Sequence, residues 1–415
     1  MGLERVAEVW RRLRPEGLSC PVVAVAGTNG KGSSVALLDA MLRAAGYRVG
    51  SYTSPHLRRY NERIRVAGHE AGDARIMAAF ERIDAARGDI SLTYFEFGTL
   101  AALDIFATAG LDVLVLEVGM GGRLDAVNII DADVALVTTV DLDHTAWLGT
   151  DRQSIALEKV GIARRGRPLV FGEVPPDSVN AFVTANAVPL YVAGREFHAQ
   201  AGVERWDWRY GDRRYADLPL PGLVGQVQLR NAAAVLMVLD RLADRLPVSD
   251  AAIRRGLREV ALPGRFQVVD GAVPTIVDVA HNPQAAGELA ATLRRTPCAG
   301  LGHAVFGMLA DKDIRGVVAA MAPVVDVWHV AGLADGRAAS LETLCGILAG
   351  MGVPGNAVFG YASVGEALSG ARRSAKPGDR VLAFGSFLVA AEVLTDPAPG
   401  AVANAVRSPL SGQAL

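Results

Sequence analysis

The sequence of 415 residues predicts an α/β protein with two domains, a larger N-terminal domain on a mostly parallel sheet and a smaller C-terminal Rossmann-like domain. Continuous apolar runs, such as VLVLEV at 113–118 and VALVTTV at 134–140, are typical of parallel strands covered on both faces. Helical patterns alternate with these runs, which favours helices on both sides of each sheet. The length exceeds that of a single core, at roughly 100–200 residues per domain.

The N-terminal domain is expected to span residues 1–262. Its first buried strand is the run PVVAVA at 21–26, which a glycine-rich turn and a helical stretch follow. The segment 195–224 alternates aromatic and polar residues, so we expect a small antiparallel excursion there. Further helical patterns cover residues 73–87, 95–109, 151–164 and 228–245.

The second domain is expected to span residues 263–395. Pro263 and Gly264 interrupt a helical pattern and indicate a hinge, after which the alternation of strands and helices restarts. Residues 396–415 contain turn formers and no periodicity, so we expect a loose tail. The expected strands of this domain cover residues 275–280, 303–308, 324–330 and 380–384.

Composition excludes several classes of protein. Lys and Arg total 42 against 44 Asp and Glu, so no general electrostatic attraction to nucleic acid is expected. No apolar stretch reaches the length of a membrane span, and we expect a cytoplasmic protein without a membrane partner. Cys20, Cys298 and Cys345 lie far apart without a CxxC motif, which argues against a disulfide framework or a cysteine zinc site.

Lysine is scarce in this chain. The 42 basic residues comprise four lysines (Lys31, Lys159, Lys312 and Lys376) and thirty-eight arginines. The lysines that remain are expected at positions that arginine cannot fill. Such positions need a compact ammonium against phosphate or a reactive amine. Chance survival is the alternative for any one of them.

A glycine-rich loop lies between a buried strand and a helix, which is the context of a phosphate-binding loop. It consists of Gly27, Thr28, Asn29, Gly30, Lys31, Gly32, Ser33 and Ser34. Its backbone N–H groups and the Lys31 ammonium suit the phosphates of a nucleotide, so the sequence predicts a P-loop ATPase domain. The match to G-x-x-x-x-G-K-[ST] is imperfect, because Val25 stands at the first glycine and Gly32 precedes the serine. The alternative is a glycine turn without chemical meaning.

Polar residues follow two further strands. Glu117 ends the run 113–118, and Asp141, Asp143 and His144 follow the run 134–140. Carboxyl ends of parallel strands are where open α/β sheets bind ligands, and carboxylates suit Mg²⁺. These residues predict a metal–nucleotide site, with a structural role for His144 as the alternative.

The chain resembles the folate branch of the Mur-ligase superfamily, the dihydrofolate synthase/folylpolyglutamate synthase family. The resemblance covers nearly the whole chain in matching order, and the run LTYFEF at 92–97 makes it specific for the folate branch. The matching segments are residues 27–34, 53–57, 61–64, 92–97, 116–128, 141–145, 158–162, 262–267, 278–285, 307–313 and 384–387.

The resemblance implies ATP-dependent ligation of L-glutamate to dihydropteroate and/or (tetrahydro)folate through an acyl phosphate, with release of ADP and phosphate. It implies two Mg²⁺ ions, a monomer, and catalytic roles for Lys31, Lys159 and His144, with Lys159 carbamylated by CO₂. For ATP binding, the resemblance implies the loop 27–34 with Asn231, Arg265 and Asp278. For folate or pteroate binding, it implies Thr93, Tyr94, Phe95, Glu96 and Leu124. For metal binding, it implies Ser54, Glu117, His144 and carbamylated Lys159.

The family has a helical segment before the position of Gly2 that forms part of the pteroate site. We therefore expect Met1 to be an internal methionine of a longer reading frame. Two alternatives stay open: another Mur-type ligase, such as one acting on a muramyl precursor, and a nucleotide-binding protein that has lost ligase activity. The sequence does not decide between one folate activity and both.

Overall fold

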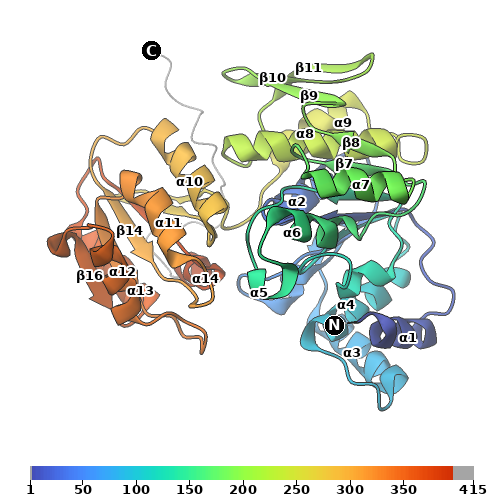
Figure 1. The fold of residues 1–415 in the computed structure, drawn as a ribbon, viewed down its shortest axis with the longest axis horizontal. Coiled ribbons are helices and arrows are strands. Elements are labelled where there is room, and N and C mark those ends of the chain that lie inside the picture. The colour runs from blue at the N-terminus through green and yellow to red at the C-terminus, as the bar shows by residue number, and fades with distance from the viewer. Residues whose placement is uncertain (1, 396–415) are drawn as a thin grey trace. The chain divides into compact units, whose positions relative to one another are not determined.

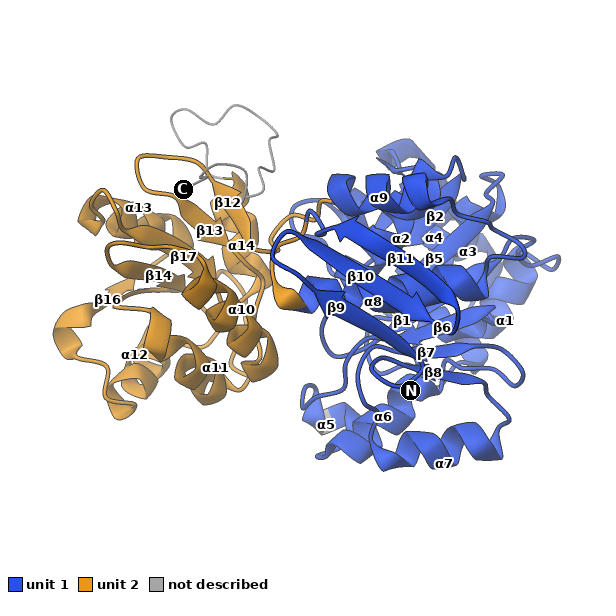
Figure 2. Ribbon diagram, turned by 90° about the horizontal axis from the view of Figure 1, so that it is seen from above, with its two compact units in different colours: residues 1–222, 227–260 blue, residues 223–226, 261–415 orange. Residues whose placement is uncertain are grey.

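The computed structural model describes residues 2–395, so the expected tail at 396–415 lies outside the described residues. The chain divides into two compact units, residues 1–222 with 227–260 and residues 223–226 with 261–415 (Figure 2). Within residues 2–395, no helix combines the length and the apolar character that a membrane span requires.

The first unit contains an eight-stranded sheet with the order β4-β3-β2-β5-β1-β6-β7-β8. The six strands from β2 to β8 in this order are parallel, and β3 and β4 are antiparallel additions at one edge. The central strands are buried on both faces, as their continuous apolar runs predict. The strands are β1 (Val22–Ala26), β2 (Val49–Tyr52), β3 (Ile64–Val66), β4 (His69–Glu70), β5 (Val113–Glu117), β6 (Val134–Val137), β7 (Leu169–Phe171) and β8 (Leu190–Val192).

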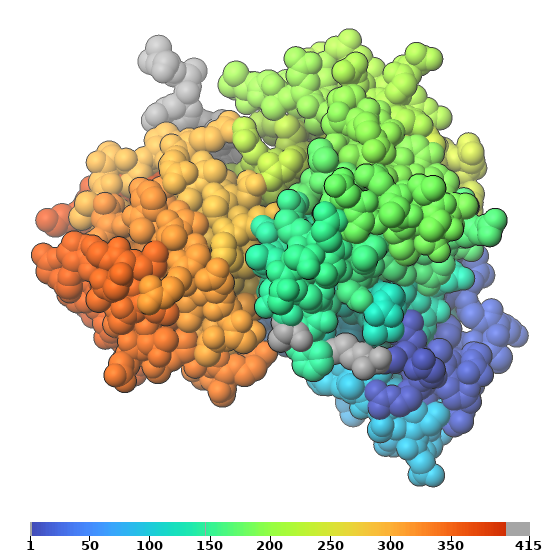
Figure 3. Space-filling view, in the orientation of Figure 1, coloured from blue at the N-terminus to red at the C-terminus, as the bar shows by residue number. Residues whose placement is uncertain are grey.

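Helices cover this sheet (Figure 1). One apolar cluster joins alternate strand residues, such as Ala24 and Leu114, to α1, α3, α4, α6 and α7. The helix α2 contacts β2 and β5 and packs on α9. The helix α3 buries only Ile76, Ala79 and Ile83, so the rest of it forms part of the surface, in light blue in Figure 3. The helices are α1 (Glu4–Leu13), α2 (Lys31–Ala44), α3 (Asp73–Arg87), α4 (Tyr94–Ala107), α5 (Thr145–Leu148), α6 (Arg152–Val160), α7 (Asp177–Ala185), α8 (Gln226–Arg241) and α9 (Asp250–Glu259).

The expected antiparallel excursion is confirmed. The strands β9 (Phe197–Ala201), β10 (Arg205–Tyr210) and β11 (Arg213–Pro219) form a three-stranded sheet that lies on α8 (Figure 1). Trp206 and Trp208 are buried, and their indole N–H groups donate to Pro219 O at 2.9 Å and to Ala233 O of α8 at 3.1 Å. Trp208 therefore attaches the small sheet to α8, whereas the Trp206 bond lies within the sheet.

The second unit contains a six-stranded sheet with the order β12-β13-β17-β14-β15-β16, parallel except for β12. The strand expected at 324–330 begins only at Val327, because Pro323 lies in a short 3₁₀ turn before it. The strands are β12 (Gln267–Val269), β13 (Thr275–Val277), β14 (Gly302–Phe306), β15 (Val327–Ala331), β16 (Val358–Tyr361) and β17 (Arg380–Phe384); the helices are α10 (Pro283–Arg295), α11 (Ile314–Met321), α12 (Leu341–Gly350), α13 (Val364–Ser374) and α14 (Phe387–Thr395). The expected fold class is confirmed.

Candidate nucleotide and metal site

Four neighbouring strands of the first unit carry the predicted residues at their carboxyl ends. In the order β2-β5-β1-β6, Ser54 follows β2, Glu117 ends β5, the loop 27–34 follows β1 and His144 follows β6. Parallel strands place these four ends at one edge of the sheet, where open α/β sheets bind their ligands. The topology therefore brings together residues as far apart in the sequence as Gly27 and His144.

The phosphate loop is held by the end of β6. Asn29 N–H donates to Thr139 Oγ1 at 3.1 Å, and Thr138 Oγ1 donates to Asn29 O at 2.6 Å. Gly30, which precedes α2, has φ of 86°, a left-handed conformation that favours glycine. A Cβ on Gly27 would lie 1.8 Å from Thr138 Oγ1. The two glycines thus let the loop turn tightly between β1 and α2.

Lys31 is the first residue of α2, and its Nζ donates to Gly27 O at 2.9 Å and Thr28 O at 3.2 Å. Ser33 and Ser34 are buried, and within residues 2–395 Ser34 Oγ has no hydrogen-bond partner. Asn231 of α8 lies beside the loop, because a Cβ on Gly30 would be 2.8 Å from Asn231 Oδ1. Its Nδ2 donates to Gln228 Oε1 at 3.0 Å.

Glu117 and Ser54 lie in direct contact. Ser54 N–H donates to Glu117 Oε2 at 3.2 Å, and Glu117 is buried. His144 precedes α5 with φ of 51°, and its Nε2 is 4.0 Å from Asp143 Oδ1. Across the described residues, no three His, Cys, Asp or Glu side chains cluster closely enough to hold a metal ion by themselves. A metal site here therefore needs other donors as well, such as the Ser54 hydroxyl.

Sequence reasoning missed the two residues that bind the backbone of Val140, at the start of the segment that leads to His144. Glu173, after β7, accepts the Val140 N–H at 2.9 Å, and Arg152 Nε donates to Val140 O at 2.8 Å. Arg152 and Glu173 also form an ion pair at 3.1 Å. Burial raises the pKa of Glu173, although Arg152 opposes the shift. In the sequence, Arg152 and Glu173 are distinguished only by their charges. Charged residues are too common for this to single them out.

Lys159 is buried in the last turn of α6, with 3% of its surface exposed. Burial lowers its pKa from 10.5 to about 7; Lys31 adds to the decrease and Asp143 opposes it. A substantial fraction of this amine is therefore neutral at physiological pH. The lysine that the scarcity argument singled out has the electrostatic setting of a reactive amine.

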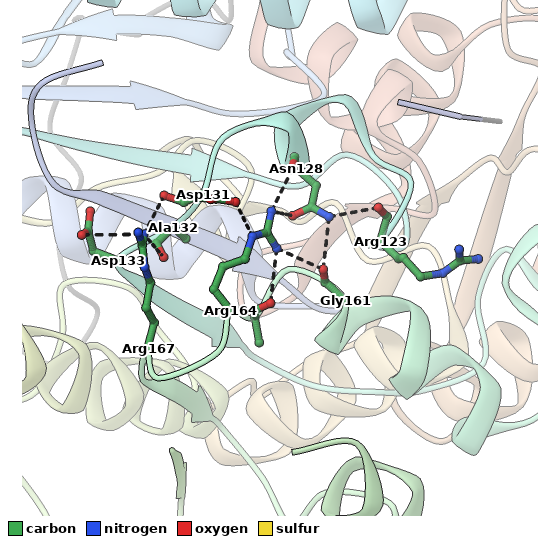
Figure 4. A network of polar contacts seen from close by, with 9 residues as sticks. Arg123, Asn128, Asp131, Ala132, Asp133, Gly161, Arg164 and Arg167 are labelled. Atoms are coloured by element: carbon green, nitrogen blue, oxygen red, sulfur yellow. Dashed lines mark hydrogen bonds and ion pairs between the residues drawn. The ribbon is translucent and has the colours of Figure 1, made fainter. Parts of the chain in front are cut away.

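The glycine-rich turn after Glu117 lies against the end of α6. A Cβ on Gly122 would be 2.7 Å from Glu158 O and 2.8 Å from Lys159 O, so only glycine permits this approach. Asn128 Nδ2 donates to Arg123 O at 2.9 Å and to Gly161 O at 3.1 Å (Figure 4). Arg164 in turn donates to Asn128 Oδ1 at 3.0 Å. This network joins the segment after Glu117 to the helix that carries Lys159.

The run predicted for folate begins α4. Thr93 and Glu96 form a capping box: Thr93 N–H donates to Glu96 Oε2 at 2.7 Å, and Glu96 N–H donates to Thr93 Oγ1 at 3.2 Å. Glu96 also pairs with Arg5 at 3.3 Å. Tyr94 is 66% exposed, and Phe95 packs on the turn after Glu117, where a Cβ on Gly119 would lie 2.5 Å from its ring. Leu124, in the same turn, is half-buried.

Arg265 and Asp278 lie together in the second unit. Asp278 accepts the N–H groups of Phe266 and Ala280, each at 2.8 Å. Burial raises its pKa, and Arg265 opposes the shift. The Arg265 guanidinium lies 5.5 Å from the centre of the Phe387 ring.

Comparison with known proteins decides the family. A model of the Mur ligase glutamate ligase domain matches residues 264–387. The dihydrofolate synthase/folylpolyglutamate synthase of Escherichia coli (strain K12) is 47% identical over 396 residues, which cover 95% of this chain and 90% of the relative. The chain belongs to the dihydrofolate synthase/folylpolyglutamate synthase family.

Solved structures agree with this family. "E.coli FolC in complex with DHPP and ADP" superposes with a TM-score of 0.90 at 45% identity, covering 95% of this chain and 92% of that one. A bifunctional folylpolyglutamate synthase/dihydrofolate synthase with Mn, AMPPNP and L-glutamate bound has a TM-score of 0.88 at 45% identity, with coverages of 95% and 93%. The resemblance and the expected ligase class are confirmed, and the alternative of a muramyl-precursor ligase is disfavoured.

Proposed function

We propose that the protein joins L-glutamate to dihydropteroate and/or (tetrahydro)folate at the expense of ATP. The acid's carboxylate oxygen attacks the γ-phosphorus, giving an acyl phosphate and ADP. The glutamate amine then attacks the acyl carbon and phosphate leaves. The arrangement of Lys31, Ser54, Glu117 and His144 on four adjoining strand ends supports this most directly, and relatives of the family bind ADP with DHPP, or AMPPNP with Mn and L-glutamate.

For the nucleotide, the loop 27–34 supplies N–H groups at the start of α2, where an anion is favoured. Lys31 holds the β- and γ-phosphates; its ammonium is already turned toward the loop carbonyls. Asn231 contacts the nucleotide beside Gly30. The assignment of Arg265 and Asp278 to the nucleotide rests on the resemblance to the family.

A divalent cation fits the donors at this edge. Glu117 offers a buried carboxylate and Ser54 a hydroxyl, oxygen ligands that Mg²⁺ prefers. We assign two Mg²⁺ ions to this edge. Together their protein ligands are Ser54, Glu117, His144 and carbamylated Lys159. A bound Mg²⁺ would neutralise phosphoryl charge and polarise the P–O bonds.

Lys159 becomes a carbamate in this account. The ammonium first releases a proton to solvent. The neutral amine nitrogen then attacks the carbon of CO₂ and loses a second proton to solvent, which gives the carbamate –NH–COO⁻. The pKa of about 7 supports this step, because only the neutral amine is nucleophilic. The carbamate turns a positive side chain beside Lys31 into an anionic ligand.

The acid substrate lies against Tyr94, Phe95 and Leu124, with Thr93 and Glu96 fixing the start of α4 beneath it. The monomeric state, the cytoplasmic location and the presence of both folate activities stay predictions.

Release of ADP tests the proposed function. Purified protein with MgATP, L-glutamate and dihydropteroate should release ADP, and omission of the acid or of L-glutamate should abolish net turnover. The same assay with tetrahydrofolate tests the second activity. ATP hydrolysis that is indifferent to both acid and amine would contradict a ligase.

A further inference from the structure

A buried arginine lies next to the predicted acid site. Arg63 is 8% exposed, and its backbone carbonyl accepts the Thr53 N–H at 2.9 Å, directly before Ser54. It precedes β3, which pairs with β2 in antiparallel register, Tyr52 opposite Ile64. Arg63 therefore belongs to the same sheet edge as the candidate metal residues.

Two aromatic rings lie close to the Arg63 guanidinium. Its Cζ lies 5.5 Å from the centre of the Tyr60 ring and 5.6 Å from that of Tyr94. The two rings contact each other edge to face at 6.1 Å. Tyr94 is one of the residues that we assign to the acid substrate, so the cation borders that site directly.

Within residues 2–395, Arg63 has no carboxylate within ion-pair distance, and its one side-chain hydrogen bond runs from Nε to His56 Nδ1 at 2.9 Å. Neighbouring arginines differ: Arg59 pairs with Asp73 at 3.1 Å and Arg65 with Glu70 at 3.3 Å. Burial and the Arg63 charge both lower the pKa of His56.

A buried guanidinium without a counter-ion is costly, because the aromatic rings replace only part of its hydration. Both Nη groups form a planar fork that matches a carboxylate. Glu62, the adjacent acid, is engaged elsewhere: it accepts the backbone N–H groups of Leu57, Arg58 and Arg59, each at 2.8 Å. The missing anion therefore has to arrive with a ligand.

We propose that Arg63 binds the carboxylate of the pteroate-type acid and holds it beside Ser54 for phosphoryl transfer. This inference rests on the proposed function, because it needs an acid substrate next to Tyr94. It adds a specificity-determining residue: neutral pterin derivatives, which lack the carboxylate, are rejected because they leave the guanidinium buried and unpaired.

The test compares binding of pteroate with binding of its methyl ester, titrated in the presence of MgADP so that no chemistry occurs. Wild-type protein should bind pteroate at least about tenfold more tightly than the ester, since charge-assisted hydrogen bonds depend on the carboxylate. Arg63→Met should lose most of this ratio by weakening pteroate binding alone, whereas Arg63→Lys should keep part of it.

Arg65→Met is the matched control, because this arginine lies two residues along β3 and is already paired with Glu70. It should leave the acid-to-ester ratio unchanged, and thermal unfolding should show all variants folded. A purely structural role for Arg63 predicts equal losses for acid and ester, and that result overturns the inference. If wild-type protein ligates glutamate but Arg63→Met keeps the wild-type ratio, only the inference fails. If wild-type protein neither binds pteroate nor ligates glutamate, the proposed function fails with it.

Discussion

Thr28 and Asp141 exchange two hydrogen bonds through one hydroxyl. Thr28 Oγ1 donates to Asp141 O at 3.1 Å and accepts the Asp141 N–H at 3.0 Å. Thr28 belongs to the phosphate loop, and Asp141 begins the segment that ends at His144. The hydroxyl therefore links the predicted phosphate loop to the segment that presents His144.

Thr28→Val should lower the rate of ligation without weakening nucleotide binding to the same extent. Valine keeps the shape of threonine but makes neither hydrogen bond, and each net bond is worth about 1 kcal/mol. We expect kcat for ligation to fall about tenfold while the affinity for ADP changes less than threefold. Steady-state kinetics and ADP titration provide the measurements. Thr184→Val on α7, which removes a bond to Asn180 O of 2.9 Å, is the control and should leave kcat unchanged.

Lys159→Arg should be nearly inactive. Arginine keeps the positive charge and most of the length but does not form a carbamate at neutral pH. Lys159→Ala should regain part of its activity when short-chain carboxylates such as acetate are added. Lys376→Arg, at an exposed lysine, should ligate at the wild-type rate. A Lys159→Arg variant with wild-type turnover would refute both the carbamate and the argument from lysine scarcity.

The reactivity of Lys159 should follow a pKa of about 7. Trace labelling with acetic anhydride in CO₂-free buffer, read by mass spectrometry of the Lys159 peptide, should reach half its maximum near pH 7. In urea-unfolded protein the same peptide should reach half-maximum near the ordinary value of 10.5. Labelling that rises only near pH 10 in the folded protein would contradict the desolvated amine.

The lowered pKa of Lys159 also makes the free energy of unfolding depend on pH. Between pH 7 and 10.5 the unfolded chain holds a proton on Lys159 that the folded chain has released. The free energy of unfolding therefore rises with pH in this window on account of this group. Relative to Lys159→Met, wild-type protein should gain stability as pH increases from 7 toward 10, as denaturant titration would show.

Arg164 should matter for activity, and Arg167 should not. Arg164 donates to Asn128, which itself donates to Gly161 O at the end of α6, whereas Arg167 donates to Asp131 O at 3.1 Å and Ala132 O at 2.9 Å (Figure 4). Arg164→Lys keeps the charge but not the fork, so we expect a several-fold lower kcat and a shifted Lys159 labelling profile. Arg167→Lys should change neither. Equal effects of the two substitutions would reduce the network to a purely structural role.

Much of the candidate site could be predicted because its residues follow apolar runs. The run 113–118 fixes Glu117 at a strand end, and the glycine pattern fixes the loop 27–34. The structural roles of Thr93 and Glu96 could also be anticipated from capping-box spacing, although the resemblance implied contact with folate.

The remaining residues could not be predicted, because their roles depend on tertiary contacts. The sequence places Glu62 next to Arg63 and suggests an ion pair. Only the structure shows that Glu62 instead accepts backbone N–H groups, which leaves the Arg63 guanidinium without a carboxylate partner among the described residues. The short strands β7 and β8 lack a distinctive pattern, so Glu173 had no predicted place beside Val140.

Transfer of oxygen from the acid to phosphate tests the central claim most directly. Dihydropteroate labelled with ¹⁸O in its carboxylate is incubated with the protein, MgATP and L-glutamate, and the released phosphate is analysed by mass spectrometry. An acyl phosphate predicts one ¹⁸O in each phosphate, because the attacking carboxylate oxygen leaves with phosphorus when the amine displaces it. Glu117→Gln should form neither labelled phosphate nor product. Unlabelled phosphate released in step with ligated product would contradict activation of the acid by phosphoryl transfer.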